Sequence, residues 1–252
     1  MPNLQGPSTD PSDICKILIR KQLVTTARVK DVLANQDKYK YSLLKKKMIN
    51  PSSADGKAAA NNLDIIDILV SRKYERKDGY PGLLDEDAIY NALAEEWKIP
   101  YKKIDPLKLD LNIVTTTIPK NFAMKHLVLP IEIQDGTLTV ATPDPFNIEV
   151  MDDIKRVTNL KVNPVVSAKG DIIRLINEFF GFKRSIAAAE NMFAGPSVDL
   201  GNLEQYVRLK TGDELPSNDQ HIVNAVNHIL LYAFDQRASD VHIEPKRDKV
   251  GS

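Results

Sequence analysis

Apolar residues recur at helical spacing near the start of the chain. Ile14, Ile17 and Leu18 form one such set, and a second set in residues 26–36 follows a threonine pair that can supply the N-cap. Residues 1–12 are polar and contain three prolines, so we expect them to be disordered. The pattern predicts a small packed helical hairpin from residue 13 onward.

The same pattern returns further along the chain. Residues 65–70 resemble residues 14–19 position by position, and a helix is expected after each copy, the second one over residues 85–97. Residues 50–62 are rich in Asn, Ser and Ala and are interpreted as a loop. We therefore predict a helical unit over residues 13–75, built from a degenerate internal repeat.

Residues 76–182 alternate between helical and strand patterns. Asp135-Gly136 lies between two alternating apolar runs, which is a strong signal for a two-residue hairpin. Asn147 is the expected cap of a helix that holds the apolar residues Ile148, Met151, Ile154 and Val157. The expected elements are a helix at 119–125, strands at 127–133 and 137–142, a helix from 147, a strand at 162–166 and a helix over about 170–180.

Residues 183–217 lose this order, and we interpret them as a linker with at most short helical pieces. Residues 218–252 then combine a strong helix pattern over 222–234 with a strand at the end of the chain. That strand lacks partners, so we expect it to begin a truncated domain. The predicted fold class is α+β: an N-terminal helical unit, a small mixed sheet with packed helices, a linker, and the start of a second α/β domain.

Composition and charge limit which partners and which cellular compartment we expect for this chain. The chain has 34 basic and 34 acidic residues, which gives no argument for binding nucleic acid or an anionic membrane. Residues 38–47 carry five lysines, but such a run is more often a solvated helix face. Cys15 is the only cysteine and lies among apolar residues, which indicates a buried thiol in a reducing compartment. No signal peptide and no apolar run of membrane-spanning length occurs.

The C-terminal strand offers one candidate metal site. Asp240, His242 and Glu244 alternate, so they would share one face of a strand. Residues on one strand face are about 6.6 Å apart, and three ligands from one short strand seldom close a coordination sphere. We therefore favour a polar strand face that pairs with a neighbouring strand, and predict no catalytic, cofactor-binding or metal-binding residue.

Several strings of residues carry a family resemblance. They are Leu93–Tyr101, Ile118–Ile131, Leu138–Pro145, Ile222–Leu230 and Ala238-Ser-Asp-Val-His-Ile-Glu-Pro245. In this order they resemble the N-terminal part of the type II secretion and type IV pilus assembly ATPases, the GspE/PilB family. The resemblance covers residues 84–182, as an MshEN-type domain, and residues 219–250, as the start of a PAS-like domain.

The resemblance implies a parent protein that hydrolyses ATP with Mg²⁺ in a RecA-type domain and forms hexamers. This chain contains no Gly-x-x-x-x-Gly-Lys-[Ser/Thr] motif, so it lacks the amides and lysine that bind the phosphates of ATP. We therefore expect a non-enzymatic fragment without a cofactor. By resemblance it would dock the motor, in the cytoplasm, to the cytoplasmic domain of an inner-membrane platform protein (GspL-type or its pilus equivalent), and meet the membrane only through such partners.

An alternative is an MshEN module that senses cyclic di-GMP. Some members of the family bind it through tandem motifs of the type Arg-Leu-Gly-x-x-Leu-Val-x-x-Gly-Leu. At the matching positions this chain has Asp13, Cys15 and Gln22 in the first copy, and Asp64 and Ile66 in the second. Aspartate at both arginine positions would repel the phosphates. The sequence therefore favours a docking and regulatory module over a nucleotide sensor.

Overall fold

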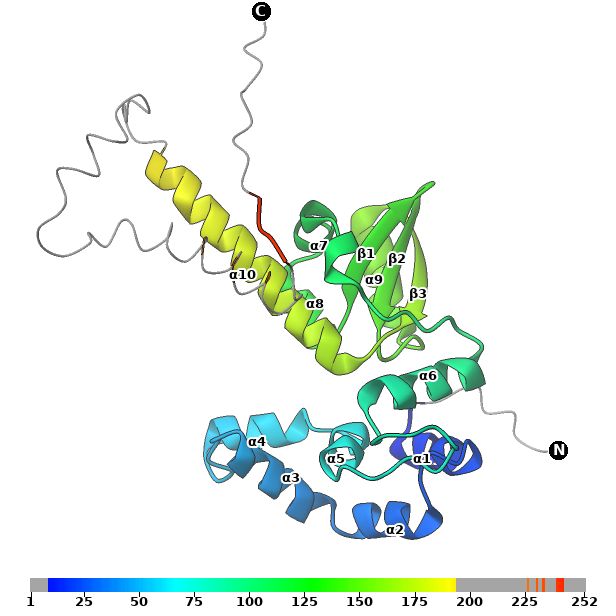
Figure 1. Cartoon of the computed structure of the whole chain (residues 1–252). Coiled ribbons are helices and arrows are strands. Elements are labelled where there is room, and N and C mark those ends of the chain that lie inside the picture. Colours follow the sequence, from blue (N-terminus) through cyan, green and yellow to red (C-terminus); the bar gives the residue numbers. More distant parts are fainter. Residues whose placement is uncertain (1–8, 194–225, 227–229, 231–232, 234–238, 243–252) are drawn as a thin grey trace, which may run out of the picture. The chain divides into compact units, whose positions relative to one another are not determined.

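The computed structural model describes residues 9–193, 226, 230, 233 and 239–242 (Figure 1). The chain divides into two compact units, Met1–Asn177 and Glu178–Ser252. The helices are α1 Pro11–Arg20, α2 Thr26–Ala34, α3 Gln36–Lys46, α4 Ala54–Asn61, α5 Ile65–Ser71, α6 Glu86–Trp97, the 3-10 helix η1 Pro106–Lys108, α7 Leu111–Thr116, α8 Lys120–His126, α9 Ile148–Thr158 and α10 Lys169–Phe193. The strands are β1 Leu129–Gln134, β2 Thr137–Thr142 and β3 Lys161–Val166.

The two expected copies of the repeat are alike in their local structure. Residues 14–19 lie in α1 and residues 65–70 lie in α5. Each helix is followed by a residue in the left-handed conformation, Gln22 (φ 58°) after α1 and Lys73 (φ 51°) after α5. A left-handed residue ends a helix by turning the chain, and it is a position that usually favours glycine. These similarities agree with an internal repeat. The repeat itself and the domain boundaries remain predictions.

The prediction of a loop over residues 50–62 is wrong in part. Residues Ala54–Asn61 form helix α4, and only the segments on either side of it are irregular. Four of the eight residues of α4 are alanines, the residue with the highest helix propensity. Their contribution outweighs that of Gly56, a residue that is unfavourable in the interior of a helix.

The sheet has the mixed topology that the sequence predicts. β1 and β2 are antiparallel, β2 and β3 are parallel, and the strand order is β1-β2-β3. Asp135 and Gly136 both have positive φ (49° and 72°), as the two-residue hairpin between β1 and β2 demands. Helix α9 connects the parallel pair and packs against β3 (Figure 1). The α+β fold class is therefore confirmed.

Helix α9 begins after Asn147, whose side chain accepts a hydrogen bond from the backbone of Val150, as predicted. The four apolar residues named for this helix do not share one buried face, however. Val150 and Ile154 are buried, whereas Ile148 and Val157 are 71% and 72% exposed. Positions three apart rotate by about 60° per step around an α-helix, so a stripe counted in threes crosses to the opposite face.

Helix α10 is longer than predicted. It continues through residue 183, the expected start of the linker, and ends at Phe193. Residues 182–193 contain three consecutive alanines and no proline or glycine, which favours helix. Residues 194–217, the remainder of the predicted linker, lie outside the described residues.

The main hydrophobic core joins α1, α2, α5 and α6 and also includes Val166 and Ala168, at the end of β3 and just after it. Leu18, Ile68, Leu69 and Leu93 are fully buried within it; such side chains each contribute about 2 kcal/mol through loss of contact with water. Cys15 is a member of this core, and burial raises the pKa of its thiol to about 11. Among the described residues no helix is long and apolar enough to cross a membrane.

Candidate functional site

A buried lysine ties the start of α10 to the start of α5. Asp64 caps α5, and its carboxylate accepts hydrogen bonds from the backbone of Ile66 and Asp67, while the Asp67 carboxylate accepts one from the backbone of Asp64. Lys169 Nζ lies 2.8 Å from Asp64 Oδ2, 2.6 Å from Asp67 Oδ2 and 2.8 Å from the carbonyl oxygen of Asn62. The Lys169 side chain is 11% exposed. All three donors of its ammonium group therefore have partners.

The protonation of Lys169 follows from these contacts. Burial acts to lower its pKa, but the charges of Asp64 and Asp67 and the hydrogen bonds to them outweigh burial, so the pKa is raised. Lys169 is consequently protonated at neutral pH. A buried cation is stable only when anions of this kind surround it.

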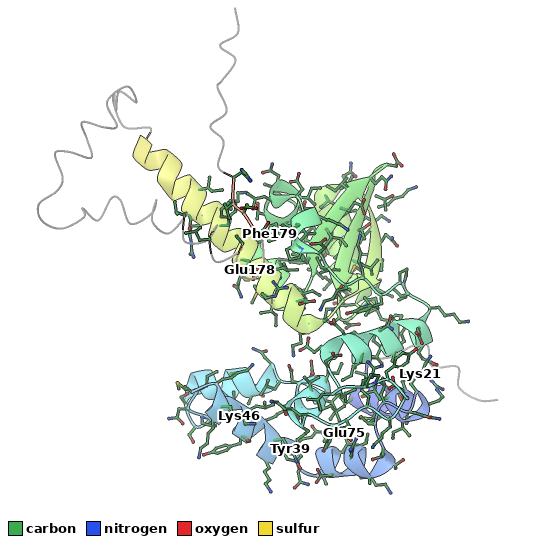
Figure 2. The ribbon with its side chains drawn as sticks, in the orientation of Figure 1. Lys21, Tyr39, Lys46, Glu75, Glu178 and Phe179 are labelled. Atoms are coloured by element: carbon green, nitrogen blue, oxygen red, sulfur yellow. The ribbon has the colours of Figure 1, made fainter. Side chains whose placement is uncertain are left out.

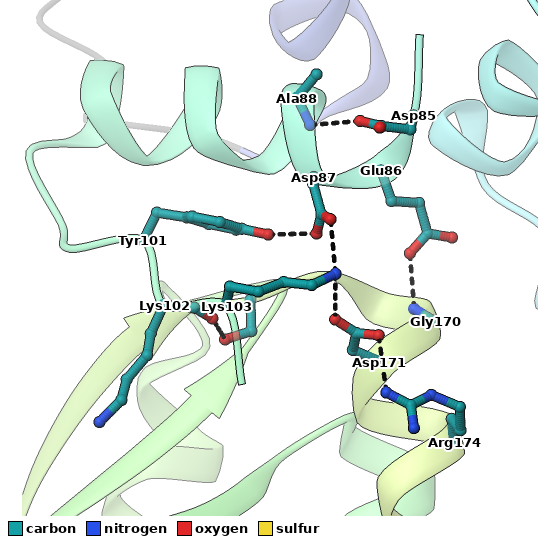
Figure 3. Close-up of polar contacts among 11 residues, drawn as sticks. Asp85, Glu86, Asp87, Ala88, Tyr101, Lys102, Lys103, Gly170, Asp171 and Arg174 are labelled. Carbon is teal, nitrogen blue, oxygen red and sulfur yellow. Dashed lines mark hydrogen bonds and ion pairs between the residues drawn. The ribbon is translucent and has the colours of Figure 1, made fainter. Parts of the chain in front are cut away.

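Glu86, the first residue of α6, holds the first turn of α10 (Figure 3). Its Oε2 accepts a hydrogen bond of 2.7 Å from the backbone N–H of Gly170. Carboxylates are favoured there because the first N–H groups of a helix have no partner within the helix. Burial and the charges of Asp67 and Asp64 raise the pKa of Glu86, although the Gly170 bond opposes that rise.

A second network of polar contacts lies beside the contacts of Lys169 and Glu86 (Figure 3). Asp87 accepts hydrogen bonds from the Tyr101 hydroxyl at 2.5 Å and from Lys103 Nζ at 2.6 Å. Lys103 also pairs with Asp171 at 2.9 Å, and Asp171 pairs with Arg174 one turn along α10. The two networks together attach the first turn of α10 to α5, α6 and the segment after α6. We call these contacts the α10 junction.

The α10 junction is suited to holding elements in place and not to catalysis. Its carboxylates are occupied by backbone amides, lysines or a tyrosine hydroxyl, and it contains no pair of a nucleophile and a base. Among the described residues no group of three or more His, Cys, Asp or Glu side chains is arranged to hold a metal ion. Its contacts therefore hold the first turn of α10 against α5 and α6.

The pH dependence of the junction can be measured through Asp87. Burial acts to raise the pKa of Asp87, but the Lys103 and Tyr101 hydrogen bonds outweigh it, so the pKa is lowered below 3.8. The folded state then holds this proton less tightly than the unfolded state, so the contribution to stability is complete above pH 3.8 and is lost as the pH falls through the lowered value. Because the side chain is 40% exposed, we expect Asp87→Asn to cost about 1 kcal/mol at neutral pH and almost nothing in strong acid.

Urea unfolding at neutral pH and well below pH 3.8 measures this difference. Asp152→Asn, on the exposed side of α9, is the matched control and should change stability by less than about 0.5 kcal/mol. An equal cost for Asp87→Asn at both pH values would show that its hydrogen bonds, and not its charge, stabilise the fold.

The two aspartates at the arginine positions of the cyclic di-GMP motif make different contacts in the structure. Asp13 lies in the first turn of α1 and pairs with Lys16. Asp64 caps α5 and binds Lys169. Cys15 and Ile66, at the glycine positions, are both buried.

Little of the C-terminal motif lies within the described residues. Residues 239–242, which include Asp240 and His242, are irregular there, and the strand predicted at this point is absent from them. Glu244 lies outside the described residues, so the shared strand face remains a prediction. Val226, Leu230 and Ala233 are helical, in agreement with the helix expected over residues 222–234.

Sequence reasoning missed the α10 junction. Asp64-Ile-Ile-Asp67 before an apolar run is a capping-box pattern, which would have identified the start of α5. No local signal marks Lys169, because its partners lie about a hundred residues earlier in the chain.

Comparison with known proteins shows what this region is similar to. The MshEN domain matches residues 97–186, so it begins 13 residues after the start of the predicted segment 84–182 and ends 4 residues after its end. The type IV pilus assembly ATPase TfpB of Acinetobacter baylyi is 30% identical over 158 residues, which cover 62% of this chain and 27% of that protein. PilB of Myxococcus xanthus is 30% identical over 173 residues, covering 65% of this chain and 28% of that protein.

Two further similarities were found. Type II secretion system protein E of Xanthomonas campestris is 26% identical over 130 residues, covering 51% of this chain and 22% of that protein. A solved structure described as MshE with cdg aligns with a TM-score of 0.44 at 16% identity, covering 66% of this chain and 97% of that chain. The matched region spans roughly a quarter of the length of the curated relatives. The chain is thus similar, as its motifs predict, to the N-terminal region of the type IV pilus assembly and type II secretion ATPases, and the MshEN domain matches its residues 97–186.

Proposed function

We propose that this chain is the docking and regulatory module of a secretion or pilus-assembly ATPase. It would bind the cytoplasmic domain of an inner-membrane platform protein, of the GspL type or its pilus equivalent, and so hold the motor at the membrane without contacting lipid. The observation that carries the proposal is the α10 junction. It fixes the first turn of α10 to α5 and α6. A partner bound to the helical part, helices α1 to α6, would therefore also restrain the first turn of α10.

ATP hydrolysis would belong to the remainder of the parent protein. The relatives are named as ATPases, and the matched region is about a quarter of their length. The α10 junction has no catalytic arrangement among its occupied carboxylates. We therefore expect the chain to influence the motor through position and not through chemistry.

The experiment is a binding measurement with the platform protein's purified cytoplasmic domain, taken from the same bacterium. We expect a saturable complex by calorimetry with the intact chain, whose folding is verified by circular dichroism. A folded chain that shows no heat of binding and no co-elution would overturn the docking proposal. A parallel titration with cyclic di-GMP tests the sensor alternative, against which Asp64 counts because its carboxylate is engaged by Lys169.

A further inference from the structure

Arginine and tyrosine side chains alternate along one side of the helical part. The Arg28 guanidinium of α2 lies 4.6 Å from the centroid of the Tyr74 ring, and Arg72, just after α5, lies 6.0 Å from the same ring. Arg72 also lies 4.6 Å from the centroid of the Tyr39 ring of α3. Three segments distant in sequence thus contribute to one stack, near the positions of Tyr39 and Glu75 in Figure 2.

An ordered loop extends this stack. Arg76 lies 5.2 Å from the Tyr80 ring centroid and pairs with Asp78, while a bridge between Glu75 and Leu83 closes the base of the loop. Tyr80 is 69% exposed and Leu83 is 50% exposed. The loop therefore presents amphipathic side chains from a fixed backbone. We call Arg28, Tyr39, Arg72, Tyr74, Arg76 and Tyr80 the arginine–tyrosine ladder.

The arginines of the ladder carry more positive charge than the neighbouring carboxylates neutralise. Among the described residues neither Arg28 nor Arg72 has a carboxylate within 4.0 Å, although Arg28 donates a hydrogen bond to the backbone carbonyl of Glu75. The nearby Asp31 carboxylate is engaged by Asn35 and by the Tyr39 hydroxyl. Residues 72–78 carry four basic side chains, Arg72, Lys73, Arg76 and Lys77, against the two acidic ones of Glu75 and Asp78.

The geometry of a stacked guanidinium decides what it can bind. A guanidinium held over a ring directs its N–H donors sideways, in its own plane, where they match the two oxygens of a carboxylate. Its orientation is already fixed by the ring, so less side-chain entropy is lost on binding. The three rings each have a guanidinium over them, which leaves them less available to stack on a nucleotide base.

We propose that the arginine–tyrosine ladder is the surface on which this chain binds an acidic segment of its platform protein. This inference rests on the proposed docking function and names the surface and the chemistry of the partner. Carboxylates of that segment would pair with Arg72 and Arg28, and apolar side chains beside them would contact Tyr80 and Leu83. Complementary charge of this kind speeds association and weakens with added salt.

Arg72→Gln is the decisive variant, because Arg72 is exposed and its replacement should leave the fold intact. We expect at least about a tenfold loss of affinity for the platform's cytoplasmic domain, since charge-assisted hydrogen bonds are lost. Arg72→Lys keeps the charge but not the planar fork and should recover only part of the affinity. Arg156→Gln, an exposed arginine of α9 that pairs with Asp153 on its own helix, is the matched control and should bind as the unmodified chain does.

A synthetic peptide of alternating glutamate and leucine provides a second probe. Weak, salt-sensitive binding of this peptide that Arg72→Gln abolishes and Arg156→Gln preserves would support the ladder. If the platform domain fails to bind in the same experiments, only the docking function is overturned. Unchanged platform affinity in Arg72→Gln would overturn the ladder and leave docking intact. Binding of neither probe overturns both, and tight cyclic di-GMP binding lost in Arg72→Gln would assign the ladder to a nucleotide instead.

Discussion

Replacing Trp97 with alanine is expected to lower the free energy of unfolding by about 4 kcal/mol. Trp97 ends α6, is 6% exposed and belongs to the main core. Its ring meets Phe146 edge to face, with centroids 5.3 Å apart and an interplanar angle of 86°. The substitution removes this contact and leaves a cavity that the rigid neighbours cannot fill. Urea unfolding measures the loss. It is followed by far-ultraviolet circular dichroism and not by tryptophan fluorescence, because the substitution removes the only tryptophan.

Trp97→Phe separates the ring contact from the indole nitrogen. The Nε1 atom of Trp97 is buried without a hydrogen-bond partner among the described residues, and an unpaired buried donor costs about 1–3 kcal/mol. Phenylalanine keeps an aromatic ring against Phe146 and removes that donor. We expect Trp97→Phe to cost less than about 1.5 kcal/mol, because relief of the unpaired donor offsets part of the lost volume. Equal losses for phenylalanine and alanine would contradict this account.

The elements that the sequence predicted correctly are those with a local cause. Asp135-Gly136 specified the hairpin because both positions need positive φ, which these residues tolerate. Asn147 specified the start of α9 through a hydrogen bond to a residue three positions on. The family resemblance likewise depended on contiguous strings of residues. Each signal lay within a few residues of the feature that it predicted.

The errors arose where one local preference competed with another, or where distant residues met. Alanines outweighed Gly56 in α4, and three alanines extended α10 beyond residue 183. No local signal marks Arg72, since its ring partners Tyr39 and Tyr74 come together only in the folded chain. The α10 junction shares this property, which explains why the sequence predicted no site residues in this region.

Lys169→Met is expected to cost about 3 kcal/mol of stability. Methionine has a similar length and keeps the apolar contacts of the stem, but it leaves Asp64 and Asp67 beside Glu86 without the cation that pairs with them. Removal of one partner from a buried ion pair costs about 3–5 kcal/mol, and we expect the lower end because the Asp64 side chain is 41% exposed. Urea unfolding at neutral pH measures the difference.

Lys46→Met, at an exposed position in the last turn of α3, is the matched control and should change stability by less than about 0.5 kcal/mol. The double variant Lys169→Met with Asp67→Asn tests whether the loss comes from uncompensated charge. If it does, neutralising Asp67 in the Lys169→Met background recovers about 1 kcal/mol, although the same change destabilises the unmodified chain. Additive losses would instead show that Lys169 acts through packing alone, and the α10 junction would then not be an electrostatic connection between α5 and α10.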